Sequence, residues 1–210
     1  MFCGAKYRAK GLPMSNFPFD ELFSTARAVS KSLTQGEFLF QKGDVATHVY
    51  TVQEGSVRLV RYSLEGHAVP MHTARPGDSF AEASLFSATY HCDAEAILPS
   101  TVICYDKEKI LAILHAHPEK SESLIAFLCR QVRSLRALLE VRSIRSAHDR
   151  VLHYLVLQAD PETMMVNVSG TLKDVAQDLT MAHETLYRTL AILEKEGQIR
   201  RRAGLIKILN

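Results

Sequence analysis

The stretch Phe80–Ala96, FAEASLFSATYHCDAEA, gathers side chains that bind ligands or react. Glu82 lies near its start, and His91, Cys92 and Asp93 follow one another near its end. Imidazoles, carboxylates and thiolates bind metals or haem, and a thiolate also takes part in redox chemistry. The same residue types also serve a folded core, because a buried Cys behaves as a small hydrophobe and a carboxylate can accept hydrogen bonds from backbone amides.

A second pair with chemical potential is Glu184 and Arg188, which share one helix face because they are four residues apart. Glu accepts a hydrogen bond from the N4 amino group of cytosine, and Arg donates two to O6 and N7 of guanine. The commoner fate of such a pair is a surface ion pair of little energetic value. The elements that position the pair decide between these interpretations.

The chain from Leu33 to Asp106 has the pattern of short β-strands. The clearest segments are HVYTV, SVRLVRY, AVPMHTA and TVICYD. Glycine-containing turns separate them every 7 to 12 residues or so, a spacing typical of a jelly roll or a related small barrel.

A long helix is expected to begin at Pro118. Apolar residues follow at spacings of three and four, as in a coiled-coil seam: Ile125, Leu128, Val132, Leu135 and Leu139. Such a short seam also suits an amphipathic helix packed on its own β domain. Its position favours dimerisation, because a long helix between two domains has little else to pack against.

The third part begins near Ala147 with an amphipathic segment that ends at Asp160-Pro161. After a short strand, MMVNV, the pattern predicts two helices, a tight turn and a hairpin: Leu172–Leu179, Thr180–Ala182, His183–Lys195, IRRR and LIKIL. Gly197 stops the second helix. This order is that of a winged helix-turn-helix.

We therefore predict an α+β protein with three parts: a jelly-roll-like β-roll sensor domain over residues 1–116, a dimerisation helix and hinge over 117–146, and a winged helix-turn-helix domain over 147–210. The formal charge of +2 does not by itself suggest nucleic acid. No apolar run approaches the roughly 18–20 residues of a membrane span, and the start has no signal-like apolar region. Four scattered cysteines suggest a cytoplasmic protein with reduced thiols and no metal site.

The segments GDVATHVYTVQEGSVRLVR, PGDSFAEASLF and HETLYRTLAILEKEGQI resemble motifs of the CRP/FNR superfamily of bacterial transcription regulators. The resemblance extends from about Leu33 to the C-terminus. It implies a cyclic-nucleotide-binding-like β-roll and a homodimer that binds an inverted repeat in double-stranded DNA. Some relatives touch RNA polymerase through the loop that is QADPETMM here. We see no nucleophile–base pair or phosphate loop for an enzyme, and the alternative from another class is a β-roll scaffold without DNA binding.

The resemblance implies that Glu184 and Arg188 read bases in each half-site. His183 and Tyr187 depart from the family, since the cyclic-AMP branch usually carries Arg at the first position and the FNR-like branch Ser at the second. We therefore expect altered flanking bases.

Two further groups of residues are candidate DNA contacts. Thr180 and Thr185 bond phosphate or base, or else cap a helix. Arg201, in the run Arg200–Arg202, is a candidate phosphate clamp on the wing.

In nucleotide-binding relatives a Gly-Glu pair opens the stretch Phe80–Ala96, and an Arg-Ser pair later holds the phosphate. Here these places hold Ala81-Glu82 and Cys92-Asp93, so an anion replaces the cation. The polar pair that meets the base aligns with Leu135 and Arg136. A carboxylate repels a phosphate by several kcal/mol in a partly dry pocket. The resemblance therefore predicts that cyclic AMP does not control this chain.

Three hypotheses for the stretch stay open. In the first it is structural and holds no cofactor. In the second the protein is a haem-dependent gas sensor, with the candidate axial ligands His67, Met71, His72 and His91. In the third Cys92 or Cys104 senses redox state, although neither has a basic neighbour in sequence. An iron–sulfur cluster would need several N-terminal cysteines, and only Cys3 is there.

Overall fold

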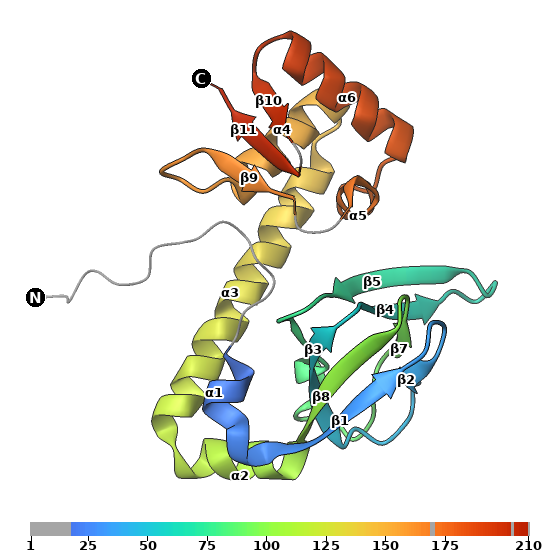
Figure 1. Ribbon diagram of the computed structural model, residues 1–210, viewed down its shortest axis with the longest axis vertical. Helices are drawn as coiled ribbons and strands as arrows, with labels where there is room; N and C mark the ends of the chain where they lie inside the picture. Colours follow the sequence, from blue (N-terminus) through green and yellow to red (C-terminus); the bar gives the residue numbers. More distant parts are fainter. Residues whose placement is uncertain (1–17, 169–170, 203, 210) are drawn as a thin grey trace, which may run out of the picture. The chain divides into compact units, whose positions relative to one another are not determined.

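The computed structural model describes residues 18–168, 171–202 and 204–209 (Figure 1). The chain divides into two compact units, and the division lies between Leu128 and Cys129, inside helix α3 (Pro118–Ser143). None of the described helices is long and apolar enough to cross a membrane. The expected domain limits at residues 116 and 146 stay predictions.

Two four-stranded antiparallel sheets form the first unit, with strand orders β1-β8-β3-β6 and β2-β7-β4-β5 (Figure 1). The strands are β1 Arg27–Leu33, β2 Phe38–Phe40, β3 His48–Glu54, β4 Val57–Tyr62, β5 Ala68–Ala74, β6 Ser79–Phe80, β7 Asp93–Ala96 and β8 Ser100–Asp106. Both sheets contribute to one apolar cluster, which includes Val52 from β3, Val57 from β4 and Ala94 from β7. The sheets therefore pack face to face, and the predicted α+β fold with an N-terminal β-roll is confirmed.

Short helices cover the other face of the sheet that contains β8. They are α1 Phe19–Phe23, the 3-10 turn Ser24–Ala26, α2 Lys107–Ala116 and the first turns of α3. Their apolar side chains surround Ile103 and Tyr105, while Val102 and Cys104 face the space between the sheets. Because β8 is buried on both faces, it lacks the alternation of a surface strand. The sequence patterns did not predict α1, α2 or most of β1.

The turn between β3 and β4 depends on a glycine. Gly55 has a φ of +82°, which favours glycine, and a Cβ there would lie 2.3 Å from the carbonyl oxygen of Pro99. Only glycine fits both demands at this turn, where the chain passes from the sheet that contains β3 to the sheet that contains β4.

The second unit is a helical domain with a small sheet. Its elements after α3 are α4 Ala147–Gln158, β9 Met165–Asn167, α5 Leu172–Asp178, α6 His183–Lys195, β10 Ile199–Arg202 and β11 Leu205–Ile208. The sheet is antiparallel with order β10-β11-β9 (Figure 1). A core that includes Val151, Leu155, Leu190 and Ile206 joins helices and sheet. The predicted helix, turn, helix and hairpin are all present.

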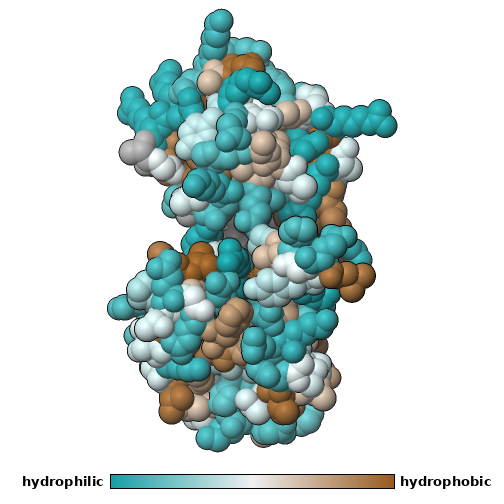
Figure 2. All heavy atoms as spheres, turned by 90° about the vertical axis from the view of Figure 1, so that its right-hand side faces the viewer, coloured by the Kyte–Doolittle hydropathy of each residue, from teal (hydrophilic) through white to brown (hydrophobic). Residues whose placement is uncertain are grey.

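The apolar seam of α3 is largely exposed. The exposed fractions are 59% for Ile125, 46% for Val132, 46% for Leu135 and 63% for Leu139. Leu128 differs, because it is partly buried against the core of the first unit. Elsewhere hydrophobic side chains occur on the surface among hydrophilic ones, as on the face in Figure 2, which is usual for proteins.

Candidate nucleic-acid interface and ligand cassette

Helix α6 separates a buried face from an exposed one. Leu186, Leu190 and Leu193 are at most 1% exposed, whereas Glu184 and Arg188 are both exposed. The helix begins at His183 and ends at Lys195, as the sequence predicted. The two candidate base-reading side chains therefore lie side by side on the solvent face of a helix that the core holds from behind.

The first turn of α6 has no side-chain cap. Its N-cap residue is Ala182, so neither Thr180 nor Thr185 caps this helix. Thr180 has a φ of +51° in the turn, and the backbone oxygen of Thr185 accepts a hydrogen bond of 2.8 Å from Thr189. Amides at an uncapped helix N-terminus favour an anionic oxygen such as that of a phosphate.

Two arginines that the motifs did not reveal hold the preceding helix, α5, in place. Arg142 Nε donates to the backbone oxygen of Asp178 at 2.6 Å, and Arg150 Nη1 donates to that of Leu179 at 3.3 Å. Cations at the C-terminal end of a helix complement its dipole. The turn between α5 and α6 is thus fixed from α3 and α4, and no local pattern in the sequence marks these contacts.

The wing hairpin carries its arginines on two faces. Arg201 is only partly exposed because its backbone amide and guanidinium both bond Glu194 of α6, at 2.9 and 2.8–2.9 Å. These bonds lower the pKa of Glu194. Arg200, Arg202 and Lys207 are exposed, and Arg200 pairs with Lys207 across the two strands. The candidate phosphate clamp Arg201 is therefore partly engaged within the domain.

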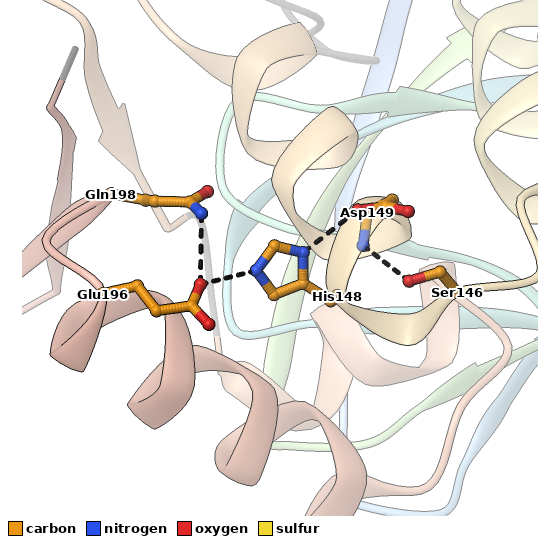
Figure 3. Close-up of polar contacts among 5 residues, drawn as sticks. All are labelled: Ser146, His148, Asp149, Glu196 and Gln198. Carbon is orange, nitrogen blue, oxygen red and sulfur yellow. Dashed lines mark hydrogen bonds and ion pairs between the residues drawn. The ribbon is translucent and has the colours of Figure 1, made fainter.

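A histidine links the start of α4 to the end of α6 (Figure 3). His148 Nε2 lies 2.8 Å from Glu196 Oε2, and His148 Nδ1 lies 3.0 Å from Asp149 Oδ1. The hydrogen bonds to Asp149 and Glu196 raise the pKa of His148. The amide of Asp149 also donates to Ser146, the N-cap of α4. The contact between His148 and Glu196 joins residues that are 48 apart in the sequence, so local patterns did not predict it.

The stretch Phe80–Ala96, from here the cassette, is built from a strained turn, a short 3-10 turn at Glu82–Ser84 and strand β7. Ala81, at the place of the family's glycine, has a left-handed φ of 67°. Cys92 is 2% exposed, and Asp93 accepts a 2.5 Å hydrogen bond from the backbone amide of Lys42. The carboxylate of Asp93 therefore bonds the protein's own backbone.

Burial shifts the pKa values of side chains in the cassette. It raises the pKa of Glu82 and of the Cys92 thiol, with the nearby Arg61 acting in the opposite direction on the thiol. Burial also raises the pKa of Cys104. Because the thiolate is the reactive form, both cysteines are poorly suited to redox sensing.

The four candidate haem ligands lie in different surroundings. The side chain of His67 is 80% exposed and Met71 is 47% exposed. His72 and His91 are partly buried, and burial lowers the pKa of each. Within the described residues there is no group of three or more His, Cys, Asp or Glu side chains that could hold a metal ion.

Comparison with known proteins finds similarity to one domain family and to transcription regulators. Residues 30–117 match the cyclic nucleotide-binding domain. The chain is 27% identical to the cyclic AMP receptor protein of Thermus thermophilus, over 83% of this chain and 81% of that one. It is also 27% identical to the nitrogen fixation regulation protein FixK of Bradyrhizobium diazoefficiens, over 84% and 76%. Over most of its length this chain is similar to transcription regulators of the CRP/FNR superfamily.

The CRP/FNR fold is also seen in the solved structures. FixK2 from Bradyrhizobium japonicum superposes with a TM-score of 0.65 and 21% sequence identity, over 87% of this chain and 92% of that one. That likeness covers both the β-roll and the helix-turn-helix part. The chain thus shares the fold of FixK2 over most of its length.

The last two candidate effector residues, Leu135 and Arg136, belong to α3. Leu135 and Arg136 are both exposed, and both lie in the second unit, whereas the cassette lies in the first. The role of each candidate effector residue, Glu82, Cys92, Asp93, His72, Leu135 and Arg136, stays a prediction.

Proposed function

We propose that this protein is a sequence-specific transcription regulator that binds an inverted repeat in double-stranded DNA as a homodimer. The observation that carries the proposal is the exposed pair Glu184 and Arg188 on α6, backed by buried leucines. A helix of this kind enters the major groove, where Glu recognises cytosine and Arg recognises guanine. The pair suits a C·G base pair in each half-site.

The exposed row on α3 supports the homodimer. Ile125, Val132, Leu135 and Leu139 are large apolar side chains at seam spacing that are 46–63% exposed, and burying the exposed part of each would contribute about 0.7–1.9 kcal/mol. A two-fold axis along this seam would set the two α6 helices about 34 Å apart, one turn of DNA. Leu128 joins this interface less fully, because the first unit already covers part of it.

The cassette supports a regulator that cyclic AMP does not control. Asp93 stands at the phosphate position with its carboxylate on the Lys42 amide, and Cys92 beside it is buried. A cyclic phosphate entering there would meet an anion rather than a cation. The structural hypothesis, in which the cassette holds no cofactor, accounts for both residues.

The other expectations follow from this role. Bacterial transcription regulators work where the DNA is, so we place the protein in the cytoplasm, acting by binding rather than by catalysis. RNA polymerase is the partner through which such binding would change transcription.

Selection of binding sites from random DNA, with wild type and Arg188→Ala, tests the proposal. Wild type should enrich an inverted repeat with a C·G pair in each half-site. Arg188→Ala should lose about 1–3 kcal/mol per half-site and lose preference at that position. Lys195→Ala is the matched control, since Lys195 is an exposed cation at the far end of the same helix. If wild type enriches no inverted repeat, the proposal is wrong.

A further inference from the structure

Helix α6 presents a second row of side chains beside Glu184 and Arg188. His183 and Tyr187 are also four residues apart, and their rings meet edge to face with centroids 4.4 Å apart at 64°. At about 100° per residue, this aromatic row borders the Glu184–Arg188 row on one side. Ile192 borders the Glu184–Arg188 row on the other side. The surface of α6 thus carries a charged row flanked by an aromatic one.

The two rings of the aromatic row contact each other and are only partly buried. Tyr187 is 45% exposed, while His183 is partly buried at the start of the helix. An edge-to-face contact of this kind restricts both rings. A large ring that is held in place yet open to solvent can contact a partner at little cost in side-chain entropy.

We infer that the row of His183 and Tyr187 reads a thymine methyl group next to the base pair that Glu184 and Arg188 read. The inference rests on the proposed function and extends it to the flanking bases. In the major groove only thymine presents a C5-methyl group, and apolar side-chain surface recognises it. Because the aromatic row borders the charged row, the two rows face neighbouring base pairs in one half-site.

The ring of Tyr187, rather than its hydroxyl group, is the reading surface. A phenol hydroxyl would instead suit a phosphate oxygen, and such a contact positions a protein on DNA without reading sequence. Tyr187→Phe keeps the ring and removes the hydroxyl, whereas Tyr187→Ala removes both. The two variants therefore separate methyl reading from phosphate contact.

The test uses the inverted repeat obtained by selection and replaces thymines one at a time by deoxyuridine, which removes only the methyl group. For wild type, replacing the flanking thymine in one half-site should weaken binding about fourfold. Replacing it in both half-sites should weaken binding about fifteenfold. Tyr187→Phe should keep this penalty, and Tyr187→Ala should lose it. Ile192→Ala, on the other flank of the same helix, is the control that should also keep it.

Thermal unfolding of each variant checks that the domain is folded, as expected for side chains that are 43–45% exposed. The inference is wrong if deoxyuridine changes nothing at any position, or if the penalty persists in Tyr187→Ala. In those cases an enriched repeat that still depends on Arg188 leaves the proposed function standing. Absence of any enriched repeat removes both.

Discussion

Helix α6, the candidate recognition helix, and the cassette both resemble motifs of one family, but their polar side chains have opposite surroundings. On α6, Glu184 and Arg188 are exposed. In the cassette, Asp93 bonds the Lys42 amide and Glu82 is desolvated, which raises its pKa. The carboxylate of Asp93 therefore bonds the protein's own backbone, whereas the polar groups on α6 face solvent. Exposed side chains stay available to a partner, whereas buried ones must find their bonds inside the protein.

The largest expected effect comes from separating the two recognition helices of the dimer. Leu135→Glu places a charge in the exposed α3 seam, so light scattering should report a monomer. Specific DNA affinity should fall by about 100-fold or more, because a single α6 loses the gain of paired binding. Arg136→Glu is the control, since it introduces the same charge beside the seam and should stay dimeric. A dimeric Leu135→Glu protein would contradict the seam assignment.

A cassette variant should change stability rather than base preference. Asp93→Ala leaves the Lys42 amide without its acceptor, so the free energy of unfolding should fall by about 1.5–3 kcal/mol. Asp93→Asn keeps a carbonyl oxygen and should lose less. Denaturant unfolding measures both variants, and site selection should recover the wild-type repeat. If Asp93→Ala changed the base preference and left the stability intact, Asp93 would act in DNA recognition rather than in holding the fold.

The wing should add affinity without selectivity. Arg202→Ala should weaken binding to all sequences alike and reduce the magnitude of the salt dependence by about one per lost phosphate contact. Arg201→Ala should do the same to a smaller extent, because Glu194 holds its guanidinium. Competition binding at two salt concentrations measures both. Equal effects of the two variants would mean that DNA displaces Glu194.

The contact between α4 and the end of α6 should make stability depend weakly on pH. The folded pKa of His148 is raised above its usual value near 6.5, so its contribution is fully present below that pH and is lost as pH rises through the folded pKa. The side chains are partly exposed, which limits the contribution to about 1 kcal/mol or less. His148→Gln should therefore destabilise more at pH 5.5 than at pH 8, as measured by thermal unfolding.

The exposed His115 on α2 supplies the control, and His115→Gln should show no such trend. An equal loss from His148→Gln at both pH values would mean that His148 acts by packing alone.

The smallest expected effect is that of cyclic AMP. Calorimetry with millimolar nucleotide should give no binding heat, and DNA affinity should not change, because we propose that Asp93 replaces the cation that holds the phosphate in nucleotide-binding relatives. Micromolar binding would contradict this interpretation of the cassette.

An absorption spectrum of protein from its native host tests the haem hypothesis, which a Soret band would support.

The sequence determined the elements whose signals are local. The period of the leucines and the stop at Gly197 predicted the limits of α6, and the turn signals on either side predicted the segment AVPMHTA, which is β5 at its observed bounds. Most of β1 was not predicted, because all but its last residue are exposed and its sequence shows no alternation. Helix α2 was not predicted, because no pattern in the sequence separated it from the strand before it.

Only the tertiary structure decided which polar side chains are available to partners. The Lys42 amide lies 51 residues from Asp93, Glu196 lies 48 residues from His148, and Arg201 bonds Glu194 across a turn. Periodicity reports which face of an element is buried, but not which distant group it meets there. Such partners depend on how the elements pack, and packing is a property of the whole fold. The sequence thus determined where the exposed pair Glu184 and Arg188 lies, and the fold decided that the carboxylate of Asp93 bonds the protein's own backbone.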